Sequence, residues 1–367
     1  MQIRYPFPNG QSTDIVMPLP SLPPAAGHGP VAPHEVALVT LTYGDRAELL
    51  AQCLEGVRRE GMRRALVLAN GLAPEPMERT RAVLEAAREA GMEIDLIESA
   101  VNLGSAAGYG RLVEMAQGDP RLRAIWFLDD DNVPRPGALA RLLEAAATDP
   151  GAAVCAVRTD RTYLIRAAET GRAIPPAPGE AFGVDVLKRP RRLWLKLTRT
   201  APNPVPTAVA VPRVPYGGLL VPSETYGRVA PPRADFVIYG DDYDYSGRLA
   251  AAAGLYLVGA ARIDDLEASW NATGAAAAGP RTQTGKLAAM PADFRLYYAV
   301  RNTLFLDRGR VGFWTWPLFA VNLLLLASLV GGRALAAGRR DTARVLLRAM
   351  RDGVFGRMGR IEAFPLP

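Results

Sequence analysis

The sequence predicts an α/β protein built around a parallel β-sheet that is covered by helices on both faces. Between residues 35 and 150, short apolar runs of strand length alternate with longer segments in which apolar residues recur at helical spacing. Strands and helices that alternate at these lengths form βαβ units, which place parallel strands side by side beneath covering helices. The 367 residues, 49% of them hydrophobic, are enough for one large domain or two modest ones.

The predicted strands and helices follow one another in a regular order. The first strand, Val36 to Leu41, ends at a Gly-Asp turn, and the apolar spacing of residues 46–61 then predicts a helix that ends at Gly61. Further strands are expected at 64–70, 93–99, 124–130 and 152–159, and further helices at 76–91, 108–118, 136–148 and 294–308.

Composition divides the chain into three predicted regions. Residues 1–34 contain eight prolines and no periodicity, which is typical of an extended arm. Residues 35–305 are expected to form the main α/β domain, with the Pro-, Gly- and Arg-rich segment 160–215 as an irregular basic insertion. Residues 306–367 are expected to form a helical C-terminal region.

The few cysteine and histidine side chains argue against several kinds of site. Cys53 and Cys155 lie far apart in apolar surroundings, so we expect two buried thiols rather than a disulfide, and a reducing compartment. His28 and His34 both fall in the Pro-rich arm, which argues against a His-based zinc site or catalytic triad. The N-terminus has no basic stretch followed by an unbroken apolar core, so we expect no secretory signal.

The positive charge of the chain is concentrated in two segments. The net charge is +6, and residues 188–199 alone hold six positive side chains and no acid. Residues 331–367 hold eight arginines against three acids. Basic segments that also carry Leu and Trp bind nucleic acid or anionic lipid. Because no nucleic-acid-binding module is recognisable, we expect a membrane surface as the partner and no nucleic acid.

One apolar segment of the C-terminal region has the length of a bilayer crossing. Residues 311–330 are 20 consecutive uncharged residues, and Trp314 and Trp316 near one end suit a membrane interface. Pro317 and Asn322 interrupt the segment, which leaves a full crossing, a buried hairpin and an interfacial helix as alternatives. We therefore expect the protein at the cytoplasmic face of the cell membrane, either peripheral or with one C-terminal membrane segment.

Polar clusters follow three of the predicted strands. They are "TYGDR" at 42–46, "ANG" at 69–71 and "DDDN" at 129–132. In open parallel sheets, ligands bind outside the carboxyl ends of the strands, so these clusters are expected to line one pocket.

The acidic cluster that follows the strand at 124–130 predicts a metal site. Crowded carboxylates raise one another's pKa unless a cation compensates, and Mg²⁺ or Mn²⁺ with oxygen ligands does so. Asp129 and Asp131 are the expected ligands. The alternative is a helix N-cap by Asp131 or Asn132, but a cap needs only one acid.

A second acidic cluster, "YGDDYDYSGR", contains Asp241, Asp242 and Asp244. A solvated turn is one interpretation of this segment. A metal and nucleotide site also needs a base that activates an acceptor, and a carboxylate serves where histidine is lacking. We therefore expect a catalytic carboxylate in this cluster.

Seven ordered segments of the chain form a further pattern. The segments are "VALVTLTYGDR", "ALVLANG", "VNLGSAAGYGR", "WFLDDDNVPRPGAL", "YGGLLVPSETYGRV", "IYGDDYDYSGRL" and "YYAVRN". In order and spacing they resemble the inverting glycosyltransferases of family 2, nearest to the rhamnosyl- and galactofuranosyl-transferase branch. The resemblance covers residues 35–305 and implies a GT-A fold.

The resemblance implies a role for individual residues of this chain. Asp129 and Asp131 would hold Mg²⁺ or Mn²⁺ on the diphosphate of a nucleotide-sugar, and Asp242 would be the general base beside Asp241. The implied donor-binding positions are Thr42, Tyr43, Arg46, Asn70, Asn102, Gly104, Arg111 and Asp130. The implied sugar and acceptor positions are Gly217, Gly218 and Asp244, with 160–215 as an acceptor loop. A structural ion pair is the alternative for Arg111.

The chain departs from the family pattern at three places. Ala69 stands where the family usually has an Asp that contacts the nucleobase, so the base is left open. Gly240 precedes the paired acids where an aromatic is common, with Tyr239 one place earlier. The family's downstream metal-binding His is absent, and its place falls near Asp264 or Asp265.

The expected function is therefore transfer of a sugar from a nucleotide-diphosphate-sugar to a hydroxyl of a lipid-linked or cell-envelope glycan. Two alternatives remain open at this point. A nucleotidyltransferase also uses a GT-A-like sheet with a carboxylate-bound metal, but "TLTYGDRAE" lacks its Gly-rich basic loop. A non-catalytic nucleotide-sugar-binding protein is the other alternative, against which both acidic clusters argue.

Overall fold

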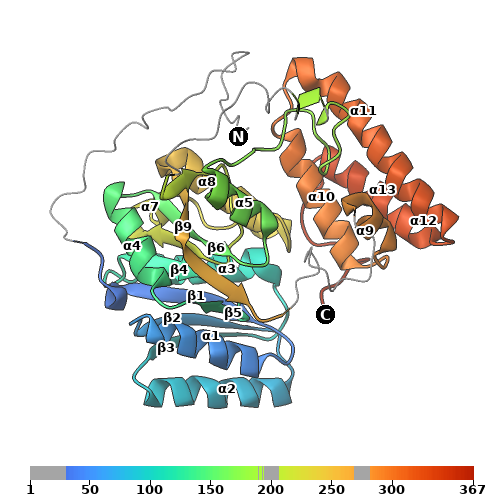
Figure 1. Ribbon diagram of the computed structural model, residues 1–367. Coiled ribbons are helices and arrows are strands. Elements are labelled where there is room, and N and C mark those ends of the chain that lie inside the picture. Colours follow the sequence, from blue (N-terminus) through green and yellow to red (C-terminus); the bar gives the residue numbers. More distant parts are fainter. Residues whose placement is uncertain (1–29, 189, 192, 194–205, 268–281) are drawn as a thin grey trace. The chain divides into compact units, whose positions relative to one another are not determined.

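The computed structural model describes residues 30–188, 190–191, 193, 206–267 and 282–367, which form two compact units (Figure 1). We call the described parts of Leu22–Pro175, Ala201–Ala277 and Leu366–Pro367 the sheet unit. The described parts of Pro176–Thr200 and Ala278–Pro365 form the helical unit. Most of the Pro-rich arm and of the basic segment 188–199 lies outside the described residues.

The first half of the sheet unit alternates strands and helices as predicted. In chain order its elements are β1 (Val36–Thr42), α1 (Ala47–Arg59), β2 (Arg64–Asn70), α2 (Pro74–Glu89), β3 (Glu93–Ser99), α3 (Gly104–Gln117) and β4 (Ala124–Phe127). The four strands pair in the order β3-β2-β1-β4, and all three pairings are parallel. The predicted bounds of β2 and β3 are confirmed, because each apolar run is closed by polar residues at both ends.

The second half of the sheet unit contains more irregular pairings. Its elements are β5 (Asn132–Pro134), α4 (Ala138–Thr148), β6 (Ala153–Arg158), α5 (Thr162–Thr170), β7 (Ala208–Ala210), β8 (Leu219–Pro222), α7 (Ser223–Tyr226), α8 (Asp241–Ala253) and β9 (Leu255–Asp265). The sheet continues from β4 as β8-β6-β9-β5, with β7 also on β9. Only β6 and β9 pair in parallel here, so the sheet is mixed.

Two local differences from the expected elements matter for the site. The strand predicted at 124–130 ends at Phe127, because the chain turns through the three acids and returns as β5. β5 pairs antiparallel with β9, so that Asn132 lies opposite Asp265. The segment 160–215, expected to be irregular, contains the helix α5 and the strand β7.

The core of the sheet unit lies on both faces of the sheet, which confirms the predicted α/β architecture. Along β1, Val36 and Leu38 belong to one buried cluster, which also includes residues of α1, α2 and α4. Ala37 and Val39 belong to the other, which includes residues of α3, α5 and α8. Successive side chains of a strand point to opposite faces, so strands buried on both faces are apolar along their whole length. Cys53 and Cys155 are buried free thiols in these two clusters, as predicted.

The helical unit contains the predicted aromatic helix. Its elements are α9 (Gln283–Ala289), α10 (Phe294–Arg308), α11 (Trp316–Leu326), a π-helical stretch (Ala327–Gly331), α12 (Gly332–Ala336) and α13 (Arg340–Val354). Short 3₁₀ turns lie at Pro33–Glu35, Ala234–Phe236 and Phe313–Thr315. Asp293 caps α10 by accepting from the backbone N–H groups of Arg295 and Leu296, at 2.9 and 3.4 Å. The buried hydroxyl of Tyr297 donates to Asp352 of α13 at 2.9 Å, which joins the two helices.

Candidate active site

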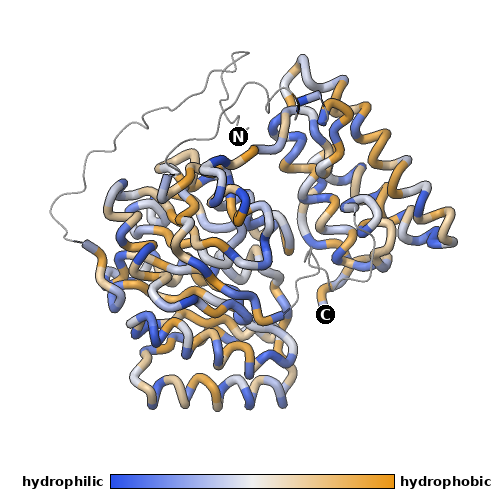
Figure 2. The backbone as a smooth tube through the Cα atoms, in the orientation of Figure 1, coloured by the Kyte–Doolittle hydropathy of each residue, from blue (hydrophilic) through white to orange (hydrophobic). Residues whose placement is uncertain are grey.

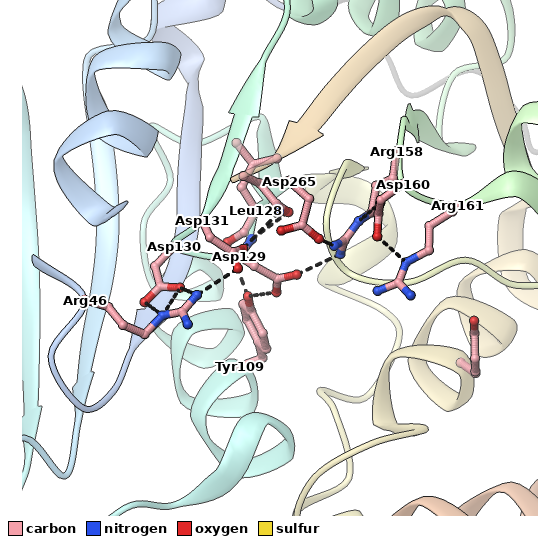
Figure 3. A network of polar contacts seen from close by, with 12 residues as sticks. Arg46, Tyr109, Leu128, Asp129, Asp130, Asp131, Arg158, Asp160, Arg161 and Asp265 are labelled. Carbon is pink, nitrogen blue, oxygen red and sulfur yellow. Dashed lines mark hydrogen bonds and ion pairs between the residues drawn. The ribbon is translucent and has the colours of Figure 1, made fainter. Parts of the chain in front are cut away.

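The loops that follow β1 and β4 meet at one edge of the sheet. Because these strands are paired neighbours, their carboxyl ends are adjacent. Arg46 follows β1, and its Nε donates to both oxygens of Asp130, at 2.9 and 3.0 Å. Its Nη2 donates to Asp131 at 2.8 Å, and its Nη1 pairs with Glu267 (Figure 3). Burial raises the pKa of Asp130 to about 7, although Arg46 acts to lower it.

A second arginine, Arg158, joins the acidic loop to the end of β9. Its Nη1 donates to Asp129 at 2.9 Å, its Nη2 pairs with Asp265, and its Nε donates to Asp160 at 3.2 Å (Figure 3). Asp129 also accepts a hydrogen bond from the hydroxyl of Tyr109, at 3.1 Å. Arg158 was missed in the sequence because a single arginine at the end of an apolar strand carries no motif. The rule that pointed to Asp129, a polar residue at a strand's carboxyl end, applies to it equally.

The ion-pair network of this edge carries more negative than positive charge. Six carboxylates meet three guanidinium groups, which leaves an excess of three negative charges when all are ionised. The carboxylates are those of Asp129, Asp130, Asp131, Asp160, Asp265 and Glu267, and the guanidinium groups are those of Arg46, Arg158 and Arg161.

This donor set fits a hard divalent cation in its chemistry. Burial raises the pKa of Asp265 to about 7, against the lowering effect of Arg158. One of its carboxylate oxygens is buried and has no hydrogen-bond partner among the described residues. Burial and the neighbouring Asp129 both raise the pKa of Asp131. Within the described residues no three acidic, His or Cys side chains already enclose a metal position. The arginines therefore lie among the oxygens that a cation would use.

The two candidates for the missing histidine differ in their surroundings. Asp265 belongs to the network of Arg158, whereas its neighbour Asp264 points to the opposite face of β9. Asp264 accepts hydrogen bonds from Arg135 at 2.8 and 2.9 Å and from Thr159 at 2.6 Å, and Arg135 lowers its pKa. Asp264 is therefore held in a separate structural ion pair.

The second acidic cluster forms the first turn of α8. Gly240 precedes the helix with a φ of 79°, in the left-handed region that glycine adopts readily. Asp241 is buried and accepts a hydrogen bond from the hydroxyl of Ser105 at 3.1 Å. Asp242 is less buried and accepts the backbone N–H of Tyr243 at 2.8 Å. Asp244 is buried and pairs with Arg248 one turn later, at 2.9 Å, which gives it a structural role within α8.

The two adjacent carboxylates of α8 titrate differently. Burial, followed by repulsion from Asp242, raises the pKa of Asp241 to about 8. Burial raises the pKa of Asp242 to about 6, with the backbone hydrogen bond from Tyr243 lowering it and Asp129 raising it. Near neutral pH, Asp242 is therefore the carboxylate that is ionised and able to accept a proton.

Gly217 and Gly218 lie against the acidic loop. A Cβ on Gly217 would come within 2.3 Å of Asn132 Oδ1, 2.8 Å of Arg158 Nη1 and 3.3 Å of Asp129 Oδ2. Gly218 has a φ of 101°, which disfavours other residues. The predicted glycine pair thus permits close packing of β8 beside Asp129.

The predicted donor-binding residues at the ends of β2 and β3 hold the loops in place. Asn70 accepts the backbone N–H of Leu103 at 2.7 Å and donates to Asn102 at 3.1 Å. Asn102 in turn accepts the N–H of Gly104 at 2.9 Å. Gly71 has a φ of 74°, and a Cβ there would lie 2.3 Å from the backbone of Asn102. These contacts bring the two predicted segments together at the sheet edge.

The remaining predicted donor residues differ in exposure. Thr42 is buried at the end of β1, whereas Tyr43 is 42% exposed and has the Arg46 guanidinium 5.1 Å from its ring centre. Arg111 is exposed on α3. Tyr43 is therefore an accessible aromatic face beside the acidic loop.

Aromatic side chains near Asp242 were also missed in the sequence. The hydroxyls of Tyr163 on α5 and Tyr243 on α8 lie 3.0 Å apart, and the guanidinium of Arg213 lies 4.7 Å from the centre of the Tyr243 ring. Arg161 and Arg213 both act to lower the pKa of Asp242. Nothing in the sequence joins Tyr163 to Tyr243, which is 80 residues away.

The open sheet, covered on both faces and carrying an acidic loop at the end of β4, has the architecture of a GT-A fold. More particularly, residues 38–207, a little under half of the chain, match the sequence model of the family described as "Glycosyl transferase family 2". The match includes the acidic loop and Arg158 and ends before α8.

Solved structures of glycosyltransferases are similar to the chain at low identity. GalNAc-T7 with UDP, GalNAc and Mn²⁺ matches with a TM-score of 0.44 and 11% identity, over 75% of this chain and 50% of that one. The mannosyltransferase PcManGT from Pyrobaculum calidifontis with GDP-Man and Mn²⁺ matches at 0.46 and 15%, over 89% and 90%. S. aureus TarS 1–349 matches at 0.40 and 9%, over 88% and 91%. The chain thus spans half the length of the GalNAc-T7 chain, and a comparison with curated proteins finds no match.

Proposed function

We propose that the protein is an inverting, metal-dependent glycosyltransferase that moves a sugar from a nucleotide-diphosphate-sugar to an acceptor hydroxyl. The observation that carries this proposal is that the sheet unit contains two separate sets of acidic side chains. One is the excess of carboxylates at the end of β4, and the other is Asp242, whose pKa responds to Asp129. A charge-rich edge suits a diphosphate with its cation, and an ionised carboxylate suits activation of a hydroxyl.

Asp242 is proposed as the general base. A carboxylate oxygen of Asp242 would take the proton of the acceptor hydroxyl. At the same time the hydroxyl oxygen would bond to the anomeric carbon of the sugar, and the bond from that carbon to the nucleoside diphosphate would break. A single displacement of this kind inverts the anomeric configuration. Asp241 is proposed as a positioning residue, because it is buried, mostly protonated near neutral pH and held by Ser105.

Asp129, Asp131 and Asp265 are the proposed ligands of Mg²⁺ or Mn²⁺. A bound divalent cation would neutralise the diphosphate leaving group. Arg158 offsets part of the carboxylate charge and keeps Asp129 beside Asp265. Arg46 does the same for Asp130 and Asp131, so its proposed part in donor binding is to orient the acids.

The donor nucleotide is proposed to lie over the ends of β1, β2 and β3. Tyr43 offers an exposed ring for the nucleobase or ribose, and Asn70, Asn102 and Gly104 shape the adjoining loop. Thr42 and Arg111 complete the proposed donor side. Ala69 is buried at the end of β2, so no carboxylate at that position selects the base.

The acceptor is proposed to be a lipid-linked or cell-envelope glycan that approaches Asp242 past Gly217, Gly218 and the tyrosine pair. Tyr163 and Tyr243 give two hydroxyls and two ring faces beside the base. Sugar rings pack on aromatic faces and hydrogen-bond to hydroxyls. The protein is further proposed to work at the cytoplasmic face of the cell membrane.

The test is a screen of nucleotide-sugars with Mn²⁺, followed by product analysis. A donor that binds the folded protein raises its melting temperature in proportion to the free energy of binding. With that donor we expect release of a nucleoside diphosphate. Release of pyrophosphate would instead identify a nucleotidyltransferase, and binding with no turnover at all would identify a non-catalytic protein.

A further inference from the structure

The helical unit exposes an apolar stripe along one helix. By length and composition one helix among the described residues is able to cross a membrane, Phe313–Ala336, which has 24 residues and is coloured mostly as hydrophobic (Figure 2). Trp314 is 89% exposed, Phe313 82% and Leu324 69%. We define the apolar stripe as the exposed side chains of Phe313, Trp314, Trp316, Val321, Leu324 and Leu335.

The opposite face of the same helix is buried in the helical unit. Phe319, Asn322, Leu326, Val330 and Ala334 are all fully buried and recur every three or four residues. This is the spacing of one helical face, so the helix is amphipathic in its packing although nearly every residue in it is apolar.

Asn322 ties this buried face to a neighbouring segment. Its Nδ2 donates to the carbonyl of Gly179 at 2.8 Å, and its Oδ1 accepts the N–H of Val186 at 2.9 Å. The segment between these two residues is also bound to α10, because the N–H of Phe182 donates to the buried Asp307 at 2.7 Å. A helix inserted across a bilayer would have to give up these bonds and leave polar groups unsatisfied in hydrocarbon. Of the two faces of this helix, the face with the apolar stripe is therefore the one that can contact lipid.

Arginines flank the apolar stripe at both of its ends. From residue 308 to residue 340 the chain holds five arginines and no acid. Two lie just before the stripe and three lie at or beyond its end, and all but the half-buried Arg310 are exposed. They are Arg308, Arg310, Arg333, Arg339 and Arg340. Tryptophan beside arginine is typical of segments that lie at the surface of an anionic bilayer.

A second copy of the chain fits this surface less well. A two-fold interface brings the same patch of both subunits together, so the arginines around one stripe would meet their own counterparts. Anionic phospholipid headgroups complement this charge, and the acyl region accepts the stripe.

From these observations we infer that the helix Phe313–Ala336 lies in the plane of an anionic phospholipid bilayer, with the apolar stripe inserted and the Asn322 face kept in the helical unit. The protein would then be monotopic and would not span the membrane. This inference rests on the membrane association in the proposed function and is independent of the transfer reaction.

Binding to lipid vesicles tests whether the apolar stripe and the arginines beside it bind an anionic bilayer. Full-length protein is floated with vesicles of phosphatidylcholine alone or with phosphatidylglycerol added. We expect binding that requires phosphatidylglycerol and weakens with salt, and roughly tenfold weaker binding of a Trp314→Ser, Leu324→Ser double variant. The matched control is Leu347→Ser, an exposed leucine of the same unit on the arginine-rich helix α13, which we expect to bind normally.

Two outcomes of the flotation experiment would overturn the inference. One is loss of binding in the Leu347→Ser control as large as that in the double variant. The other is a dimer of the free protein that the double variant abolishes. Both variants are expected to hydrolyse the donor without vesicles at the normal rate, so weak vesicle binding and lack of enzyme activity are separate results.

Alkaline extraction of membranes distinguishes a helix that lies on the bilayer from a helix that crosses it. Alkaline carbonate releases proteins held at one surface and leaves spanning proteins in the pellet. We expect the wild-type protein in the supernatant. A wild-type protein that stays in the pellet would instead show a crossing helix and overturn the inference.

Discussion

Asp241 and Asp242 are adjacent in the chain and yet have different proposed tasks. Asp241 is buried and bonded to Ser105, whereas Asp242 is partly exposed and accepts a backbone N–H. Burial raises the pKa of both, to about 8 and about 6. Repulsion from Asp242 raises the pKa of Asp241 further, whereas the N–H of Tyr243 acts to lower the pKa of Asp242. One carboxylate is therefore available as a base near neutral pH while its neighbour holds a proton.

Activity should fall as the pH is lowered through about 6, because Asp242 must be deprotonated to accept a proton. Asp242→Asn should lower kcat by roughly 10²- to 10⁴-fold and leave the donor KM nearly unchanged. The measurement is a pH–rate profile of both proteins. An Asp242→Asn variant with wild-type kcat would show that another group is the base. Asp241→Asn, which keeps the neutral state of that side chain, is the control and should retain most of the activity.

Arg158 is the residue on which the acidic network depends most. Arg158→Gln would leave Asp129 and Asp265 without their arginine partner, and loss of one partner from a buried ion pair such as Arg158–Asp265 costs about 3–5 kcal/mol. We expect a lower melting temperature in metal-free buffer and a larger rise on addition of Mn²⁺ than for the wild type.

The matched control for Arg158 is Arg135→Gln. Arg135 pairs with Asp264 at 2.8 Å, but about half of its side chain is exposed, so its loss should cost about 0–1 kcal/mol. Equal destabilisation of the two variants would mean that the Arg158 network is not a buried unit.

At the scale of elements, the return of the chain from β4 through β5 builds the site. The turn at the three acids ends β4 early, and the pairing of β5 with β9 sets Asn132 opposite Asp265. β8 then approaches the same turn closely because Gly217 has no side chain. The position of the acids therefore depends on β8 and β9, which are distant from them in sequence.

Gly217→Ala should displace the acidic loop, because its Cβ would lie 2.3 Å from Asn132 Oδ1. We expect at least a tenfold loss of transfer and a lower melting temperature. Gly247→Ala is the control: it lies inside α8, the nearest atom to a Cβ there is 3.9 Å away, and alanine should stabilise the helix by about 0.5–1 kcal/mol. Normal transfer by Gly217→Ala would show that the loop tolerates the shift.

At the scale of the whole molecule, each unit carries one part of the proposed activity. The sheet unit contains both acidic clusters, and the helical unit carries the apolar stripe and the exposed arginines beside it. Substitutions in the sheet unit should therefore impair sugar transfer, and substitutions in the apolar stripe should impair membrane binding.

Removal of metal tests the sheet unit of the intact protein. Treatment with EDTA should abolish transfer, and either Mg²⁺ or Mn²⁺ should restore it, because the proposed ligands are all carboxylate oxygens. The protein should remain folded without metal, since Arg46 and Arg158 already offset part of the charge. Full transfer at the lowest metal concentration that EDTA can achieve would contradict metal dependence, and circular dichroism provides the check on folding.

Local patterns in the sequence were enough to predict the strongly periodic elements and the two acidic clusters. The strands β2 and β3 and the helix α10 have the predicted bounds, because apolar spacing and polar ends act within a few residues of each other. The acids of the loop after β4 and of α8 were found for the same reason, since each cluster is contiguous in the chain.

Tertiary structure alone decided which groups meet. Arg46 pairs with Glu267 across 221 residues, and Arg158 reaches Asp265 across 107. The pairing of β9 with β5, β6 and β7 in the mixed half of the sheet, and the face on which Asn322 is buried, likewise follow from long-range contacts. Such contacts depend on the register of distant strands and helices, which no local periodicity encodes. The sequence thus determined the parallel half of the sheet, its helices and the acids, and the fold determined that arginines hold those acids together.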